Sequence, residues 1–134
     1  MSEPVLIKSS DGNSVLEFTA GGFPEVIGVK LRGCGFSGAI EANLLESPME
    51  LAKFFRELAD HWRGWPGKKH WESFEHDLFL DATSDSTGHI YLAVRLRGSS
   101  WGDWHLRGSV IVDAGQLESI AATMEHFGED CRVA

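Results

Sequence analysis

The chain has 134 residues, of which 43% are hydrophobic and 24% are charged. This composition is ordinary for a folded domain and excludes disordered, collagen-like and coiled-coil classes, while the length predicts a single domain over residues 1–134. Twelve Lys and Arg residues against twenty Asp and Glu residues give a formal net charge of -8. That balance excludes the broad basic surface needed for non-specific binding to nucleic acid or to an anionic membrane, so we expect neither as a partner.

The distribution of apolar residues, cysteines and histidines predicts a cytoplasmic protein without a metal or a cofactor. Residues 1–4 include no basic segment before an apolar run, and no segment approaches the ~18–20 apolar residues that span a bilayer. Cys34 and Cys131 lack the close spacing of zinc and redox motifs. None of the six histidines is paired at the i+2 or i+4 spacing that places two imidazoles on one face.

The first half of the chain alternates apolar and polar residues in short runs that are separated by glycine-containing turns. We predict four strands here, over residues 5–7, 15–18, 26–31 and 36–44. In the last of them Phe36, Ile40 and Leu44 share one face, which is the period of a half-buried antiparallel strand.

A helix is predicted over about residues 47–63. Ser47 suits the N-cap, Pro48 suits the first helical position, and Glu50 can complete a capping box. Apolar residues then recur at helical spacing, and Gly64 suits a left-handed stop. The helix is therefore amphipathic and suited to lie on a sheet.

The second half returns to alternating apolar residues from Trp71 onward and ends in another helix. Strands are predicted over residues 71–82, 90–96 and 104–112, so that Trp71 starts the first of them. Asp113 suits the cap of a helix over about residues 114–127, and Gly128 suits its end. The element order ββββ-α-βββ-α predicts an α+β fold, with a twisted, mostly antiparallel sheet of about seven strands and two amphipathic helices.

The five tryptophans are expected to gather at one end of the domain. In a meander the start of the first strand, the end of the second and the start of the third share an edge, and the loop after the first helix leads there. A candidate binding site at this tryptophan-rich end comprises Trp65, Trp101, Trp104, Lys68, Lys69, His70 and His105. An aromatic plug that seals the end of the sheet is the alternative. We expect Trp65 to be exposed in its glycine- and proline-containing loop and Trp71 to be buried.

A second candidate site is an acidic ridge formed by Glu72, Glu75 and Asp77. These residues belong to the stretch between His70 and Ser86, which holds five Asp and Glu residues and no Lys or Arg. Clustered negative charge attracts a basic protein partner and raises its association rate. A solvated face without a partner is the alternative.

The outer face of the predicted sheet carries positive charge. If the apolar residues of the strands point inward, five cations point outward, namely Lys30, Arg32, Arg95, Arg97 and Arg107. Together they are enough to bind an anionic ligand. Glu17 and Glu41 are also placed to neutralise them in cross-strand pairs, and we favour the pairs because exposed ion pairs are common.

The region from Phe54 to Phe127 contains an ordered set of aromatic, glycine and apolar residues. The set comprises Phe54, Phe55, Leu58, Ala59, Trp62, Arg63, Gly64, Trp65, Trp71, Leu78, Leu80, Ala82, Asp85, Gly88, His89, Ile90, Leu96, Arg97, Trp104 and the run Ala114-Gly115-Gln116-Leu117-Glu118. On these residues the chain resembles the small bacterial proteins of domain-of-unknown-function family 6228. Its layout is more distantly similar to that of immunity proteins against wall-associated contact-dependent toxins. The resemblance implies the predicted fold and a binding role, and it brings no catalytic residues.

No catalytic motif is present in the sequence, which lacks a nucleophile elbow, a phosphate-binding glycine loop and a His-Glu-x-x-His segment. Together with the resemblance, this favours a non-enzymatic cytoplasmic binding protein, in its specific form an immunity-like protein that occludes a partner toxin domain. The alternative is a small-ligand-binding or minor hydrolytic domain that uses the tryptophan-rich end through His70, His105 or Glu72. A domain that self-associates through an antiparallel edge strand is a third hypothesis.

Overall fold

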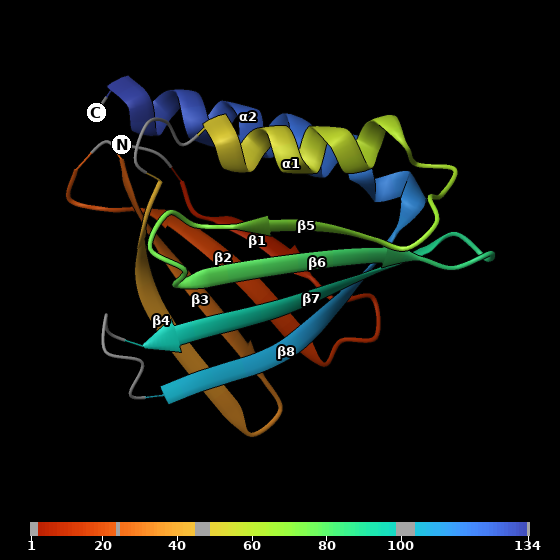
Figure 1. Ribbon diagram of the computed structural model, residues 1–134, viewed down its shortest axis with the longest axis horizontal. Coiled ribbons are helices and arrows are strands. Elements are labelled where there is room, and N and C mark those ends of the chain that lie inside the picture. The colour runs from red at the N-terminus through yellow and green to blue at the C-terminus, as the bar shows by residue number, and fades with distance from the viewer. Residues whose placement is uncertain (1–2, 24, 45–48, 99–103, 134) are drawn as a thin grey trace.

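The computed structural model describes residues 3–23, 25–44, 49–98 and 104–133 (Figure 1). Within these residues the chain forms, in order, β1 (Val5–Lys8), β2 (Ser14–Ala20), β3 (Val26–Gly33), β4 (Phe36–Asn43), α1 (Met49–Asp60), β5 (Lys68–Glu72), β6 (Leu78–Ser84), β7 (His89–Gly98), β8 (Trp104–Asp113), the 3-10 turn η1 (Ala114–Gln116) and α2 (Leu117–Val133). No helix in the described ranges is both long and apolar enough to cross a membrane.

The predicted α+β class, antiparallel pairing and element order are confirmed, with eight described strands in place of about seven. The strands form two antiparallel sheets in sequence order, β1-β2-β3-β4 (the first sheet) and β5-β6-β7-β8 (the second sheet). The additional strand is β5, which pairs Trp71 with Leu80. Its sequence Lys-Lys-His-Trp-Glu carries one apolar residue in five, so it lacks the alternation that predicts a strand.

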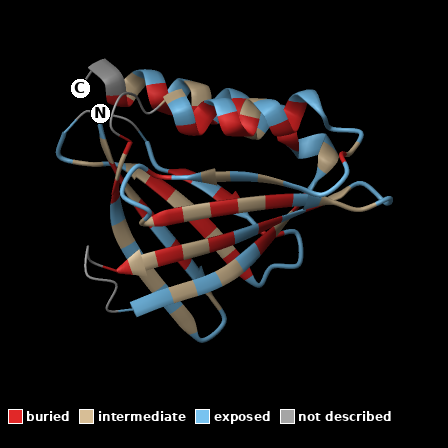
Figure 2. Cartoon of the chain, in the orientation of Figure 1, coloured by how far each residue is buried: buried red, intermediate tan, exposed pale blue. Residues whose placement is uncertain are grey.

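The two sheets face each other, and α1 and α2 lie side by side along one side of both (Figure 1). Buried residues alternate with more exposed ones along the strands, as Figure 2 shows for β6 and β7. The buried faces of both sheets and both helices form one hydrophobic core that includes Phe18, Leu31, Phe55, Leu92 and Met124. Alternation places the polar residues of every strand on an outer face.

Two glycines allow the sheets to approach closely. A Cβ atom on Gly38 of β4 would lie 2.5 Å from Leu106 Cδ2 of β8. A Cβ atom on Gly108 of β8 would lie 2.9 Å from Leu31 Cδ2 of β3. Because real Cβ atoms essentially never come within 3.0 Å of another heavy atom, the absence of a side chain at both positions sets the spacing of the sheets here.

The helix boundaries differ from those predicted. The first helix ends at Asp60, and the chain turns before Gly64, which adopts a positive φ of 116°. Ser47 and Pro48 lie outside the described residues. The second helix continues through the buried Gly128, where a stop was predicted, because Phe127 and Cys131 extend its buried stripe by another turn.

An arginine joins the two helices. Arg56 of α1 donates two hydrogen bonds to Glu118 at 2.8 and 2.9 Å, and two more to Glu125 at 2.7 and 2.9 Å, both on α2. These bonds raise the pKa of Arg56 above its already high value, mainly through Glu125, and they lower the pKa of Glu125. The bond pair to Glu125 is bidentate, whereas both bonds to Glu118 come from Nη1, and together they fix the relative position of the helices.

Candidate functional site

The outer face of the second sheet carries four of the nine predicted site residues that the structure describes, namely Lys68, His70, Glu72 and His105. Strand register places one row of side chains from each strand on this face. We call it the outer face, and it comprises Lys68, His70 and Glu72 of β5, Phe79, Asp81 and Thr83 of β6, Tyr91, Ala93, Arg95 and Arg97 of β7, and His105, Arg107 and Ser109 of β8.

A groove with a volume of about 390 Å³ crosses the outer face. All four strands contribute to it, and the side chains that matter chemically are His70, Phe79, Asp81, Arg95 and Arg107. The groove is partly open to solvent, so it is a surface depression suited to a protruding group of a partner. Carboxylates lie toward β5 and β6, and arginines lie toward β7 and β8.

His70 links the carboxylates of the groove. Its Nδ1 lies 2.6 Å from Asp81 Oδ1, and its Nε2 lies 3.1 Å from Glu72 Oε1. Hydrogen bonding to Asp81, and then to Glu72, raises the pKa of His70. Glu72 is also hydrogen-bonded to His76, and the two histidines lower the pKa of Glu72. The two carboxylates in this half of the groove are therefore hydrogen-bonded to histidines.

The cationic half of the groove is built differently. The guanidinium carbon of Arg95 lies 3.9 Å from the ring centroid of Phe79, and Arg107 is directly opposite Arg95 in the register. In the part of the chain that the structure describes, no carboxylate lies within ion-pair distance of either guanidinium. Arg95 Nε is buried and has no hydrogen-bond partner among these residues. This positive charge is not neutralised.

The acidic ridge is brought together at the turn between β5 and β6. Glu75 and Asp77 line a second hollow of about 380 Å³, together with Arg97 and Trp104. Burial and then the nearby Glu75 carboxylate raise the pKa of Asp77. Arg97 donates a hydrogen bond to the backbone oxygen of Glu75 at 2.9 Å, and this bond connects the acidic ridge to β7.

The expectation that the tryptophans gather at one end is wrong for those that the structure describes. Trp65 Nε1 donates to the carbonyl oxygen of Ala82 at 3.1 Å, near the end of β6, whereas Trp104 pairs with Gly98. Ser84 at the end of β6 pairs with residue 90 of β7, whereas Trp104 pairs with residue 98 of the same strand. At about 3.3 Å per residue, these two positions lie about 25 Å apart along β7. Trp101 lies outside the described residues.

The reason for this error is β5. The sequence pattern assigned Trp71 to the start of the strand that contains Leu78, but Trp71 belongs to a separate strand that runs antiparallel to β6. The loop that contains Trp65 therefore enters at the opposite end of the sheet.

The burial expected for two of the tryptophans is also wrong. Trp65 is 9% exposed and buried, while Trp71 is only partly buried. Lys69 shares the inner side with Trp71, and its Nζ lies 2.7 Å from Glu57 of α1 and 5.7 Å from the Trp65 ring centroid. Of the seven residues predicted for the tryptophan-rich end, Lys68, His70 and His105 lie on the outer face.

The expected cross-strand pairing of the cations is wrong for the second sheet. Glu17 lies opposite Lys30, but both belong to the first sheet, as does Glu41. The arginines of the outer face lie on β7 and β8, and the strands paired with these two carry no glutamate. Glu72 of the same sheet lies on β5, which pairs only with β6, and it is bonded to histidines.

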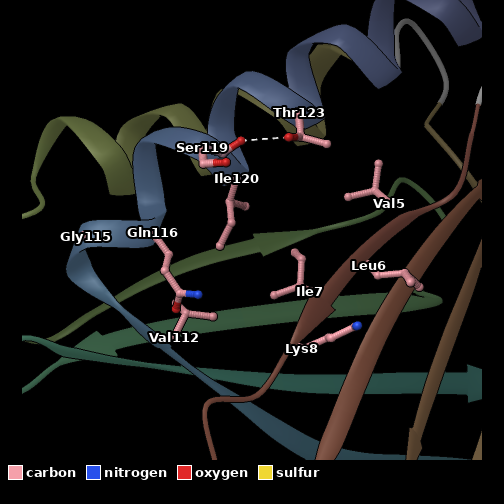
Figure 3. A pocket seen from close by; sticks show the side chains of 10 residues that line it. All are labelled: Val5, Leu6, Ile7, Lys8, Val112, Gly115, Gln116, Ser119, Ile120 and Thr123. Carbon is pink, nitrogen blue, oxygen red and sulfur yellow. Dashed lines mark hydrogen bonds between the residues drawn. The ribbon is translucent and has the colours of Figure 1, made fainter.

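A third hollow, of about 410 Å³, lies between β1 and α2 (Figure 3). Ile7 and Ile120 point into it from opposite sides. The backbone N–H of Ser9 donates to Ser14, and the alternation of antiparallel pairs then directs the backbone groups of Leu6 and Lys8 to the open edge of β1. This edge is short, carries a lysine and follows Pro4, three features that protect an edge strand from pairing. The hollow therefore lies beside a strand edge that is protected from pairing, and we assign it no binding role.

The fold and the site together define an α+β protein with two antiparallel sheets and a charged, grooved outer face. Within the described residues, no group of three or more His, Cys, Asp or Glu side chains is arranged to hold a metal ion. The model of the DUF6228 family, a family of unknown function, matches residues 20–130, and the chain belongs to that family. The match begins well before Phe54, the first residue on which the resemblance rests, so it also includes β3 and β4. No curated protein matches the sequence.

Proposed function

We propose that the chain is a non-enzymatic binding protein whose outer face and acidic ridge bind a protein partner. The observation that supports this most is the separation of charge on one exposed grooved face, with carboxylates at β5 and β6 and arginines at β7 and β8. Separated charges of opposite sign set the orientation of a partner and raise its rate of association.

The state of His70 favours binding over catalysis. A general base needs an imidazole nitrogen that is free to accept a proton from the substrate. Both nitrogens of His70 are directed at carboxylate oxygens, and its raised pKa favours the imidazolium form, in which both nitrogens are donors. In this arrangement His70 holds Glu72 and Asp81 in place.

The exposed side chains around the face are of types that are common in protein interfaces. Phe74 at the β5–β6 turn, Tyr91 on β7 and Trp104 on β8 are large exposed hydrophobic residues. Aromatic residues and arginines supply much of the binding energy at protein interfaces, and Tyr91 lies in the same outer row of β7 as Arg95 and Arg97.

An immunity-like role is the specific form of this proposal. The acidic ridge is suited to a basic surface, such as that of a toxin domain that acts on nucleic acid. A cytoplasmic location, where such a toxin would be occluded, belongs to the same proposal. The distant resemblance in layout to immunity proteins supports it as an analogy of fold.

The rate of association tests the proposal. A tagged form of the chain is used to isolate the partner from the cells that produce this chain. Stopped-flow mixing then compares the association rate of the wild type with that of the triple variant Glu72→Gln, Glu75→Gln, Asp77→Asn. We expect slower association by the variant, with the largest difference at low salt, because charges at the rim of an interface act over roughly 8–10 Å.

The matched control is Glu25→Gln, Asp60→Asn, Glu129→Gln, which removes the same charge from exposed positions outside the site. Its association rate should stay close to that of the wild type at low salt. Equal rates for the two triple variants would contradict the proposal, because the effect would then depend on net charge alone.

A further inference from the structure

We infer that the groove of the outer face is an oxyanion site in which Arg95 and Arg107 bind a carboxylate or phosphate group between them. The inference names the chemical group that the outer face recognises, and in that respect it rests on the proposed function. It is carried by the geometry of two arginines that have no ion-pair partner among the described residues.

The position of the two arginines is the first step. Arg95 and Arg107 are directly opposite each other on neighbouring strands, on the same exposed face. Like charges in this relation repel and destabilise the sheet. An anion placed between the two guanidinium groups changes that repulsion into attraction, and each planar group can offer it two N–H donors.

The way in which Arg95 is held is the second step. Its guanidinium lies over the ring of Phe79 at 3.9 Å. Contact with the face of an aromatic ring orients the guanidinium without using its hydrogen-bond donors, because these donors lie in the plane of the group. The Nε of Arg95 is buried and has no hydrogen-bond partner among the described residues. The described part of the chain therefore leaves this donor unsatisfied.

The balance of charge in the groove is the third step. The groove also contains Glu72 and Asp81, which would otherwise repel an anion. Both are hydrogen-bonded to His70, and Glu72 is bonded to His76 as well. Among the described residues, the groove side chains without an ion-pair partner are those of Arg95, Arg107 and the exposed Lys68, which are all positive.

A titration with small anions tests the inference without the partner. Amide spectra of the ¹⁵N-labelled chain are recorded with inorganic phosphate and with acetate, against sodium chloride at equal ionic strength. We expect saturable shifts of the amides near Arg95 and Arg107 with both oxyanions. The variant Arg107→Gln should bind them at least about tenfold more weakly, because a charge-assisted hydrogen-bond pair is lost.

Arg32→Gln is the matched control, because Arg32 is an exposed strand arginine on the first sheet. It should leave the affinity within about twofold of the wild type, and unchanged amide spectra elsewhere will show that each variant is folded. Shifts that chloride reproduces, or an affinity that Arg107→Gln does not change, would overturn the inference.

The source of the anion is distinguished by competition with the isolated partner. If phosphate slows partner association and Arg107→Gln does the same, the anion is an acidic group of that partner. If phosphate binds at the arginines and leaves association unchanged, the site takes a free small oxyanion, and the inference holds while the protein partner binds elsewhere. Partner association without any oxyanion binding would overturn the inference and leave the proposed function standing.

Discussion

At the scale of single residues, Trp65 shows how a loop residue becomes part of the core. It lies between Gly64 and Pro66, yet its backbone N–H and its indole N–H both donate to β6, at Ser84 Oγ and at the Ala82 carbonyl oxygen. A buried indole that keeps its hydrogen bond adds a large apolar area without a penalty for its polar atom.

The first prediction is that Trp65→Ala destabilises the protein by about 3–5 kcal/mol, because a large buried side chain is lost and a cavity remains. The exposed Trp62, at 53%, provides the control, and Trp62→Ala should cost under about 1 kcal/mol. Chemical denaturation of both variants measures the difference. Equal costs would mean that the loop does not contribute to the core.

The second prediction concerns the pH dependence that His70 imposes on stability. Its pKa is raised in the folded state by Asp81 and Glu72, so its contribution is fully present below the unfolded value near 6.5 and is lost as the pH rises through the folded value. The loss of melting temperature caused by His70→Gln should therefore be larger at pH 5.5 than at pH 8.5. Because the site is exposed to solvent, the change is roughly 1–3 °C.

Thermal melts of the wild type and of His70→Gln at both pH values provide the measurement. His126→Gln is the control, since that residue lies on α2 and its pairing is confined to Asp130 of the same helix. If His70→Gln lowers the melting temperature more at pH 8.5 than at pH 5.5, the assignment of His70 as the cation between two carboxylates is contradicted.

At the scale of elements, the second sheet is held against the first where glycines remove side chains from the contact. Gly108 faces Leu31, which is fully buried, while its neighbour Ser109 faces solvent on the outer face. The same strand therefore carries both the packing of the sheets and part of the candidate site.

The third prediction is that Gly108→Val costs about 1–3 kcal/mol, because its side chain overfills the contact with Leu31. Ser109→Val, one residue further along β8, should be close to neutral because it adds a β-branched residue to an exposed strand position. Chemical denaturation of both variants makes the comparison. A neutral Gly108→Val would show that the sheets can move apart without cost.

The elements also show which parts of the fold can be predicted from the sequence. Strands β1, β2, β3, β4, β6, β7 and β8 follow from alternation, because one of their faces is buried. β5 does not alternate, since it is an edge strand whose outer row is polar and whose inner row includes Lys69. Because β5 was not predicted, Trp65 was expected at the wrong end of the sheet. The division of the strands into two sheets was not predicted either.

At the scale of the whole molecule, the candidate site was predicted in part. The acidic ridge and the outward direction of Arg95 and Arg107 follow from short-range spacing. The bond between His70 and Asp81 depends on the register of β5 against β6, which spacing alone does not determine. The absence of cross-strand partners for the arginines depends on which strands share a sheet.

The central claim is that the outer face of the second sheet is the binding surface, and mapping the isolated partner onto the ¹⁵N-labelled chain tests it most directly. The account predicts that amide signals change within residues 68–83, 91–97 and 104–109. It also predicts that those of residues 5–8 and 115–123, beside the hollow between β1 and α2, stay in place. Changes confined to residues 5–8 and 115–123 would contradict the account.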